Sequence, residues 1–491
     1  MVGIADKIND NGEVLIPLSP LDAVMNTYRV VVLYIYPRPS ASGVEFDLNK
    51  LQRSFTTLVD EDYPVLVGKL DIDREAGTLN VKQSPEERQR GGAGIRFETN
   101  PLNSQTVDDA MASLSWEFMP KPRVGGEIIA VKCSLLADGG LAIGVDCSHV
   151  LFDGEAMFTF MKTWGQHYSG VGKLKRLVIN HDRHLLAGKG EICRHPHPEF
   201  QTTPARPLIR QPDGSLAPKA VSKPPKTAQH VFHLSPSNMA QMKKMASGAP
   251  EAPESSVPHE SRTNITANLL SVFNSERKRV ANSQAASCPS YVSTLDAITA
   301  LFAILISRAR GHNQSVRIST AVNGRRRLEP PLPTNYAGNA VFHAISSYSS
   351  KDLQQQSGTE GEVSSSTLSR VAHGVRASIL ERDNDFMRDT IAFLASQSDP
   401  SSINDNVEFF FGPDVAFTCW ANMGLYDAEF EGTRPSYASI PRVQCMDGFV
   451  LITETPKAEE GLDVLVCLEC ATMDKFKALC ANMPLLQNSK D

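Results

Sequence analysis

Residues 147–157 read CSHVLFDGEAM and place His149, Asp153 and Gly154 in an H-x-x-x-D-G arrangement. A neutral imidazole can take a proton from a hydroxyl or an amine near pH 7, because its ordinary pKa is about 6.5. Asp153 could hold the loop and so aim the ring, and Gly154 leaves room for a close approach. The chain contains twelve histidines, so roughly one H-x-x-x-D match is expected by chance. From these residues alone, a general base and a buried histidine bonded to backbone both remain open.

The segment before His149 has the alternating pattern of a buried strand. Residues 128–136 and 141–147 flank a glycine-bearing turn, so they predict a hairpin that ends just before His149. Strand ends that open into loops are where α/β proteins place working residues. After Asp153, apolar residues at helical spacing predict one buried helix face, made of Ala156, Met157, Phe160, Met161 and Trp164. The motif is therefore expected between a strand end and a helix start, with Asp153 as the helix cap.

The rest of the chain also alternates strand-like and helix-like segments. A strand is expected over 30–37 and a helix over 48–58, and the helical pattern breaks at Pro64. This alternation predicts a mixed α/β fold. The polar stretches at 247–261 and 346–366 are expected to be surface loops.

A shift in composition divides the chain. Residues 196–226 are rich in proline and lack periodicity, so they predict an extended crossover between two domains, 1–195 and 227–491. The second domain is expected to open with a strand and then a helix, whose start is marked by Ser235 and Pro236.

Composition argues against several classes of protein. Hydrophobic residues make up 41% of the chain and charged residues 21%, which allows a large core. The net charge of −6 disfavours nucleic acid as a partner. The polar, acid-containing start lacks a targeting pattern, and the apolar run at 30–37 is too short to span a membrane. The nine cysteines are scattered singly and fit free thiols in a reducing compartment, so a cytoplasmic location is expected.

Several stretches together resemble one family, the BAHD-type acyl-CoA-dependent acyltransferases, in a fungal-like version. Besides HVLFDG, these stretches are LSPLDAVM at 18–25, INHDRHLL at 179–186, YVSTLDAITALF at 291–302, VNGRRRLEPPLPTNYAGNAV at 322–341 and FTCW at 417–420. The resemblance implies α/β mixed sheets in two chloramphenicol-acetyltransferase-like domains, with the active-site channel between them. It also implies a monomer.

The chain departs from the family pattern in one segment. Residues 429–433, EFEGT, stand where the family has DFGWG, and only Phe430 and the later Pro435 hold. Because the family's aspartate pairs with an arginine, Glu429 is expected to pair with Arg325. In the related HHxxxDG superfamily a second histidine precedes the first, and here that position is Ser148. This favours a CoA-dependent enzyme over a carrier-protein-dependent condensation-type enzyme.

The resemblance implies direct transfer of an acyl group, other than an aminoacyl group, from acyl-CoA to a small-molecule alcohol or amine. His149 is the implied base, Asp153 orients its loop, and the Thr418 hydroxyl is the candidate donor to the oxyanion. Four further residues are expected to contact substrates: Gly154, Trp420, Ser293 and Thr294. Acyl-CoA acts as a co-substrate, with no tightly bound cofactor and no metal.

Three alternatives remain beside this reading. Cys147 could act as a covalent nucleophile, because residues i and i+2 of a strand share a face. Cys193, His195 and His197 could bind a metal, although their prolines favour a solvated loop. The chain could also be a non-catalytic CoA or small-molecule binder that kept the fold and lost turnover.

Overall fold

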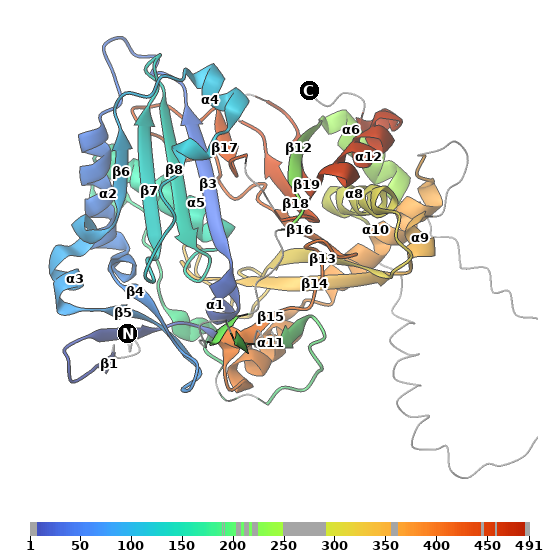
Figure 1. Cartoon of the computed structure of the whole chain (residues 1–491), viewed down its shortest axis with the longest axis horizontal. Helices are drawn as coiled ribbons and strands as arrows, with labels where there is room; N and C mark the ends of the chain where they lie inside the picture. The colour runs from blue at the N-terminus through green and yellow to red at the C-terminus, as the bar shows by residue number, and fades with distance from the viewer. Residues whose placement is uncertain are drawn as a thin grey trace, which may run out of the picture.

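Two large β-sheets organise the chain, one in each lobe of the molecule (Figure 1). The computed structural model describes residues 7–188, 190, 192–202, 208–210, 216–218, 224–248, 291–354, 362–442, 446–456 and 459–486. The first sheet has the order β17 (Tyr437–Ser439), β3 (Arg29–Tyr36), β8 (Leu141–Ser148), β7 (Ile129–Leu135) and β6 (Phe97–Asn100). The second has the order β12 (Thr227–Leu234), β19 (Leu462–Glu469), β18 (Phe449–Glu454), β16 (Val415–Cys419), β13 (Val316–Asn323) and β14 (Val341–Tyr348). Both sheets mix parallel and antiparallel pairs, which confirms the predicted mixed α/β class.

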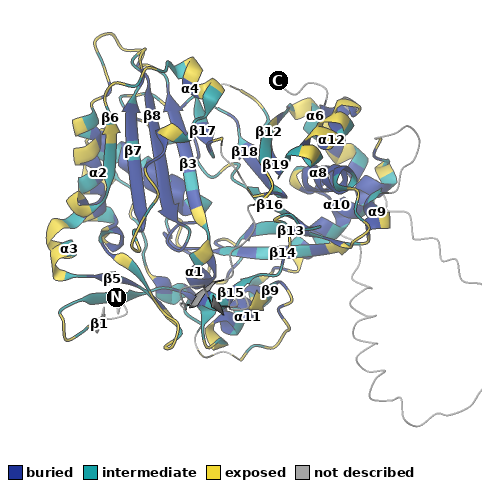
Figure 2. Ribbon diagram, viewed as in Figure 1, coloured by how far each residue is buried: buried dark blue, intermediate teal, exposed yellow. Residues whose placement is uncertain are grey.

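The first lobe is built around β8, whose eight residues are all buried (Figure 2). Ile143 and Val145 face the core made with α2 (Leu48–Asp62) and α5 (Gly154–Tyr168), whereas Ala142 faces a second cluster beside α4 (Val107–Ser113). Since β8 is covered on both faces, it can hold the loop that follows it in one position. The predicted hairpin is confirmed, because β7 pairs antiparallel with β8.

The predicted apolar face of α5 is confirmed as well. Its five residues, Ala156, Met157, Phe160, Met161 and Trp164, are all buried in the core of the first lobe. Burial of Met157, Phe160 and Met161 contributes about 1.5–3 kcal/mol for each side chain relative to an exposed one. The indole nitrogen of Trp164 also donates to Ser54 Oγ of α2 at 3.0 Å, so the two helices are joined by a hydrogen bond within the apolar contact.

In the second lobe, helices gather on the side of the sheet that faces away from the first lobe (Figure 1). They are α6 (Pro236–Ala246), α8 (Thr294–Arg310), α10 (Ser365–Leu380) and α12 (Cys470–Ala481). The central helix α8 is held by its capping box and ends at Gly311, whose φ of 67° suits glycine. The predicted strand-to-helix start is confirmed, since Ser235 caps α6 and Pro236 is its first residue.

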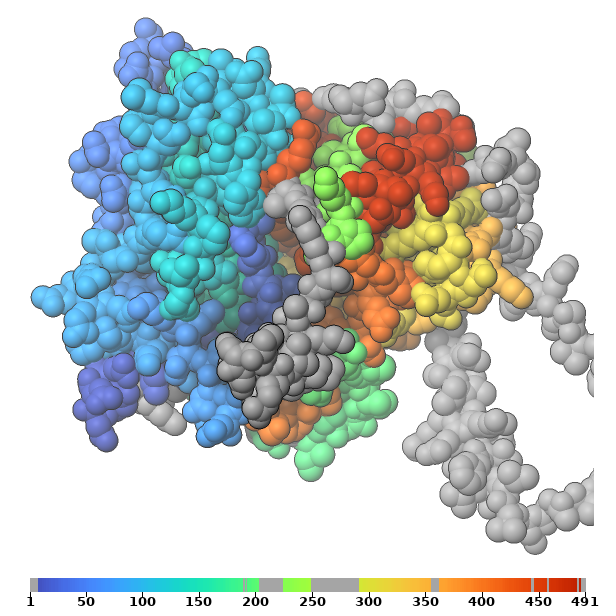
Figure 3. Space-filling model, viewed as in Figure 1, coloured from blue at the N-terminus to red at the C-terminus, as the bar shows by residue number. Residues whose placement is uncertain are grey.

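A segment from the second half of the chain completes the first lobe. Strand β17 pairs antiparallel with β3, with Ala438 opposite Tyr34. Leu425, Tyr426 and Phe430 also belong to the core of the first lobe. The two halves of the chain therefore meet along an extensive seam, which Figure 3 shows between the blue-green and the yellow-to-red atoms.

The crossover is partly ordered into strands. Strand β9 (Phe200–Thr202) pairs with β15 (Ile403–Asp405), and β10 (Leu208–Arg210) pairs with β11 (Leu216–Pro218). The polar stretch at 247–261 lies mostly outside the described residues. The prediction of a loop over 346–366 is wrong in part, because it contains the end of β14, α9 (Ser350–Gln354) and the start of α10. Serine and aspartate residues there act as helix caps and not as loop residues.

Shorter elements complete the fold. They are β1 (Lys7–Ile8), β2 (Val14–Pro17), β5 (Thr78–Gln83) and β4 (Lys69–Asp73), which form a small sheet, and α1 (Pro20–Val24), α3 (Pro85–Arg90) and α11 (Asn384–Ser396). None of the described helices combines the length and the apolar character needed to cross a bilayer.

Candidate active site

A cavity of about 460 Å³ lies where the two lobes meet. The first lobe contributes His149, Asp153 and Gly154, which follow β8 and begin α5. The second lobe contributes Thr418 and Trp420 from the end of β16. The structure therefore brings five of the predicted site residues to one cavity, although they come from segments far apart in the sequence.

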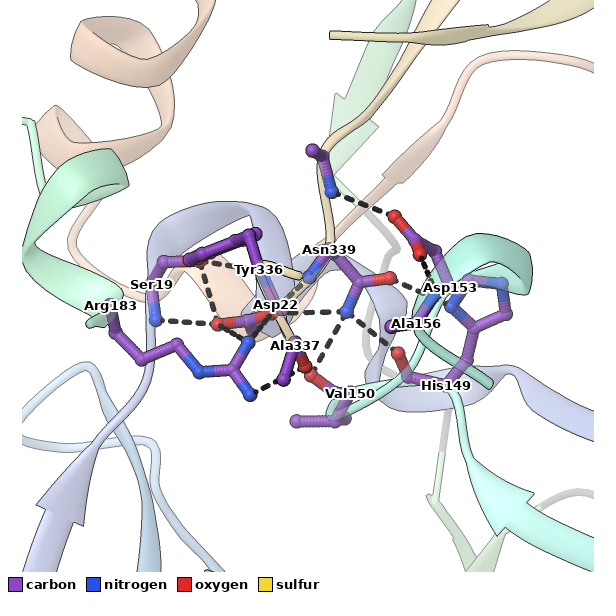
Figure 4. Close-up of polar contacts among 12 residues, drawn as sticks. Ser19, Asp22, His149, Val150, Asp153, Ala156, Arg183, Tyr336, Ala337 and Asn339 are labelled. Atoms are coloured by element: carbon purple, nitrogen blue, oxygen red, sulfur yellow. Dashed lines mark hydrogen bonds and ion pairs between the residues drawn. The ribbon is translucent and has the colours of Figure 1, made fainter. Parts of the chain in front are cut away.

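His149 is held by Asn339, a residue that sequence reasoning missed (Figure 4). The Nδ2 atom of Asn339 donates to the Asp22 carboxylate at 3.0 Å and to the carbonyls of His149 and Val150 at 2.7 and 2.9 Å. These three acceptors fix the amide, so its Oδ1 faces His149 Nδ1 at 3.0 Å. Because an amide oxygen only accepts, Nδ1 must carry the proton. The Nε2 lone pair is then free to act as a base in the cavity.

The protonation equilibrium of His149 favours this role. Burial lowers the pKa of His149 and outweighs the nearby Asp153 carboxylate and the Asn339 bond, both of which raise it. The ring is therefore neutral near pH 7, which a general base requires.

Asn339 in turn rests on the fully buried Asp22, whose carboxylate is a hub for hydrogen bonds (Figure 4). Asp22 accepts from the Ser19 hydroxyl at 2.7 Å, from the Asn339 backbone N–H at 3.0 Å and from Arg183 Nη1 at 3.2 Å. Asp22, Arg183 and Asn339 lie in the stretches 18–25, 179–186 and 322–341 that carry the family resemblance. The family resemblance of those three stretches was therefore the only sequence feature discussed above that pointed to these residues.

Asp153 supports the histidine loop from the other side. It is buried, caps α5 by accepting from Ala156 N at 3.0 Å, and accepts from Ala340 N at 3.0 Å. Arg325 donates to both of its oxygens, at 2.6 and 2.9 Å. Burial alone would raise the pKa of Asp153, but the charge and hydrogen bonds of Arg325 outweigh it and hold that pKa below its ordinary value. Asp153 therefore joins the two lobes as a carboxylate.

The expected pair of Glu429 with Arg325 is wrong. Arg325 is engaged by Asp153, which offers a buried, bidentate partner. Glu429 is 47% exposed and lies 3.6 Å from Arg434. Phe430 packs edge-on against Trp164 and Tyr168 on the first lobe. The altered segment at 429–433 is therefore a support for α5 and does not line the cavity.

Thr418 lies on β16 and Trp420 directly follows that strand, and both line the cavity. Trp420 explains the glycine of the motif. A Cβ atom at Gly154 would lie 3.0 Å from the indole nitrogen of Trp420. Gly154 thus lets the tryptophan of one lobe pack against the helix start of the other.

Ser293 and Thr294 lie elsewhere. Ser293 caps α8, where its hydroxyl accepts from Asp296 N at 3.2 Å, and Thr294 is the first residue of that helix. Neither belongs to the described lining of the cavity. Cys147 is buried in the apolar core of the first lobe, and burial raises the pKa of its thiol far above the ordinary value. A protonated thiol in the core is poorly suited to nucleophilic attack.

The prediction of a solvated loop at 193–197 is wrong for His197. Its ring is buried between Glu199, 2.8 Å from Nδ1, and Asp389, 3.2 Å from Nε2. Cys193, His197 and Asp389 could offer three metal ligands within 4.8 Å of one another. The Asp389 oxygens already accept the backbone N–H groups of Arg194 and His195 at 2.7 and 2.9 Å. Through these hydrogen bonds, Asp389 of α11 anchors the crossover segment, and this role explains why the cluster forms.

Comparisons with known proteins identify the family and the fold of the chain. The model of a family described as the Transferase family matches residues 4–483. A hydroxycinnamoyltransferase of Narcissus pseudonarcissus is 23% identical, and the match covers 94% of both chains. The Avena sativa protein hydroxycinnamoyl-CoA:5-hydroxyanthranilate N-hydroxycinnamoyltransferase HHT4 is also 23% identical, over 95% of both. The structure of F. graminearum TRI101 complexed with coenzyme A and deoxynivalenol is similar with a TM-score of 0.68 and 16% identity, over 94% of this chain and 97% of that one. The structural likeness confirms the predicted fold class.

Proposed function

The chain belongs to the Transferase family, the BAHD-type acyltransferases, and on that premise we propose that it transfers an acyl group from acyl-CoA to a small-molecule alcohol or amine. One observation carries the proposal most directly. Asn339 holds the His149 ring so that Nδ1 bears the proton and Nε2 is free at a cavity lined by both lobes. A neutral histidine base at such a junction fits a reaction between two substrates that meet there.

The proposed reaction has one tetrahedral intermediate. His149 Nε2 takes the proton of the acceptor hydroxyl or amine, and the acceptor attacks the thioester carbonyl of acyl-CoA. The Thr418 hydroxyl donates a hydrogen bond to the developing oxyanion. When the intermediate collapses, the carbon–sulfur bond breaks and the protonated His149 returns its proton to the CoA thiolate. The products are the acylated acceptor and free CoA, so no other reactant is needed.

Hydroxycinnamoyl-CoA is the first donor to test, because two relatives carry that acyl group in their names. Both oxygen and nitrogen acceptors remain candidates. All seven of the cysteines that the structure describes are free thiols, which fits the reducing cytoplasm.

The test is product formation from purified protein with acyl-CoA donors and pooled alcohol and amine acceptors, read by mass spectrometry. We expect an acylated product whose rate falls by about 10²- to 10⁴-fold in His149→Ala, the range for losing a positioned base. His195→Ala is the matched control, since this histidine is exposed and does not line the cavity. A His149→Ala protein as active as the His195→Ala control would overturn the assigned base. A protein that binds acyl-CoA without forming product would support the non-catalytic binder.

A further inference from the structure

The cavity holds a second group of polar side chains apart from the His149 network. Tyr28, Ser319, His343 and Asp405 all line it. Ser319 Oγ lies 3.4 Å from His343 Nδ1, and His343 Nε2 lies 3.5 Å from Asp405 Oδ1. Burial raises the pKa of Tyr28, and the nearby Asp405 carboxylate raises it further. The four residues therefore form a connected polar group around the carboxylate of Asp405.

The Asp405 carboxylate is incompletely satisfied. Its side chain is only 9% exposed, and its Oδ1 atom is buried without a hydrogen bond. The facing atom, His343 Nε2, is also buried without one. Buried polar atoms in folded proteins are nearly always hydrogen-bonded, and the 3.5 Å contact with His343 Nε2 satisfies Oδ1 only weakly. Because Asp405 lines the cavity, the part of its carboxylate that stays exposed there can accept a hydrogen bond from a ligand.

The backbone around Asp405 is built to hold this position. Asp405 ends β15, where it stands opposite Phe200 of β9, so the crossover supports it. On the other side, Asn26 Nδ2 donates to the Ser401 carbonyl at 2.7 Å, which joins the segment before β15 to the turn that carries Tyr28. The crossover and the turn before β3 therefore both support a residue that has no role in the reaction proposed above.

The charges at the cavity favour an acceptor substrate with a hydroxyl or an ammonium group over one with a carboxylate. Its two lining arginines are engaged: Arg325 donates to both Asp153 oxygens, and Arg29 lies 2.7 Å from Asp146. Asp405 is not in an ion pair with an arginine or a lysine among the described residues. A carboxylate on the acceptor would meet repulsion at this end of the cavity, whereas a hydroxyl or an ammonium group would be attracted.

We propose that Asp405 anchors the acceptor substrate by accepting a hydrogen bond from a second group of that substrate, either a hydroxyl or an ammonium group. The reacting group of the same substrate lies at His149. His343 and Tyr28 are positioning residues that hold the carboxylate. The proposal rests on the proposed acyl transfer and narrows the acceptor to molecules with two donor groups and no carboxylate near the second one.

The test pairs bifunctional acceptors with matched monofunctional ones: putrescine with butylamine for the ammonium arm, and tyrosol with phenethyl alcohol for the hydroxyl arm. Acceptor Kd is measured by calorimetry on the CoA-loaded protein, and acceptor and donor KM are measured where turnover occurs. The variants are Asp405→Asn, which keeps an acceptor oxygen and loses the charge, and Asp405→Ala. Glu408→Gln is the control, because it removes an exposed carboxylate three residues away that does not line the cavity.

We expect the wild-type protein to bind at least one bifunctional acceptor more tightly than its partner compound. Asp405→Asn should weaken an ammonium-bearing acceptor by about 100-fold and a hydroxyl-bearing one by about tenfold, because hydrogen bonds to charged groups are the stronger class. The donor KM should stay at the Glu408→Gln value. His343→Gln should weaken the same acceptor and leave its monofunctional partner unchanged.

Two results overturn the proposal. One is equal binding of bifunctional and monofunctional acceptors by the wild-type protein, including no measurable binding of either. The other is an Asp405→Ala protein that matches the Glu408→Gln control on every acceptor. Failure of the proposed acyl transfer has a different signature, which is acceptor binding that depends on Asp405 without any acylated product.

Discussion

The amide of Asn339 contacts His149 at two points, with its oxygen 3.0 Å from the ring Nδ1 and its nitrogen 2.7 Å from the backbone carbonyl. One side chain of the second lobe therefore fixes both the ring and the backbone of a histidine in the first lobe. The orientation of the base depends on the docking of the lobes, and not only on the loop in which the H-x-x-x-D-G motif lies.

The acid limb of the pH profile tests the state of His149. Burial lowers the pKa of His149. We expect kcat/KM to fall with an apparent pKa below about 6.5, the ordinary histidine value. The same shift makes the folded state lose stability as the pH falls below about 6.5 and down to the lowered pKa, because the unfolded chain binds the proton more readily. Initial rates at subsaturating acceptor across the acidic range provide the measurement, and an apparent pKa at or above the ordinary value would contradict it.

Asn339→Ala tests the orientation of the ring. Without the amide, Nδ1 and Nε2 can exchange the proton and the ring can turn, so we expect kcat to fall by up to about 100-fold, the scale of a small misplacement. The KM for acyl-CoA should stay near the wild-type value. The variant should also lose about 1–3 kcal/mol of stability, because Asp22 and two carbonyls lose a buried donor. Steady-state kinetics beside urea unfolding separate the two effects, and an unchanged kcat would remove the orienting role.

Arg325→Met tests the ion pair that joins the lobes. It leaves the buried Asp153 carboxylate without its bidentate partner, so we expect a loss of about 3–5 kcal/mol in the free energy of unfolding. Adding Asp153→Asn should recover part of this loss, since it removes the uncompensated charge. Arg434→Met is the matched control, because Arg434 is 45% exposed and its partner Glu429 lies 3.6 Å away. That change should cost at most about 1 kcal/mol. Urea unfolding measures both losses. Equal losses in the two single variants would show that the buried Arg325 pair contributes no more to stability than the exposed Arg434 pair.

Gly154→Ala tests the contact between the motif glycine and Trp420. The added Cβ would lie 3.0 Å from the indole nitrogen, so either the ring or the helix start must shift. We expect a loss of about 1–3 kcal/mol in stability together with a lower kcat/KM. Gly172→Ala is the control, since a Cβ atom there meets open space and the change should stay within about 0.5 kcal/mol. Thermal unfolding and kinetics that are the same for both variants would mean that Trp420 moves freely.

Elements with strong periodicity were predictable from the sequence. The hairpin of β7 and β8 and the apolar face of α5 follow from alternation and helical spacing, and both were placed correctly. His149, Asp153 and Gly154 were predicted as one site because they are neighbours in the chain. Thr418 reached the same cavity only through the family resemblance, since no local pattern distinguishes it from other strand threonines.

Relationships between distant segments were not predictable. Nothing in the spacing links Asn339 to Asp22 and His149, because loops from both lobes bring them together. The predicted partner of Arg325 is wrong because several acids compete for one arginine, and burial decides in favour of Asp153. The prolines that flank His197 predict a solvated loop, yet the crossover turns inward and places His197 against Asp389.

The position of β17 has a consequence for the order in which the protein folds during synthesis. Strand β17 covers the free edge of β3, where Ala438 pairs with Tyr34. β3 therefore leaves the ribosome some four hundred residues before its partner strand. Until then the nascent first lobe presents an unpaired apolar strand edge, a known starting point for aggregation. Completion of that lobe must therefore wait for most of the second one, so a truncated chain ending at the crossover would remain dependent on chaperones.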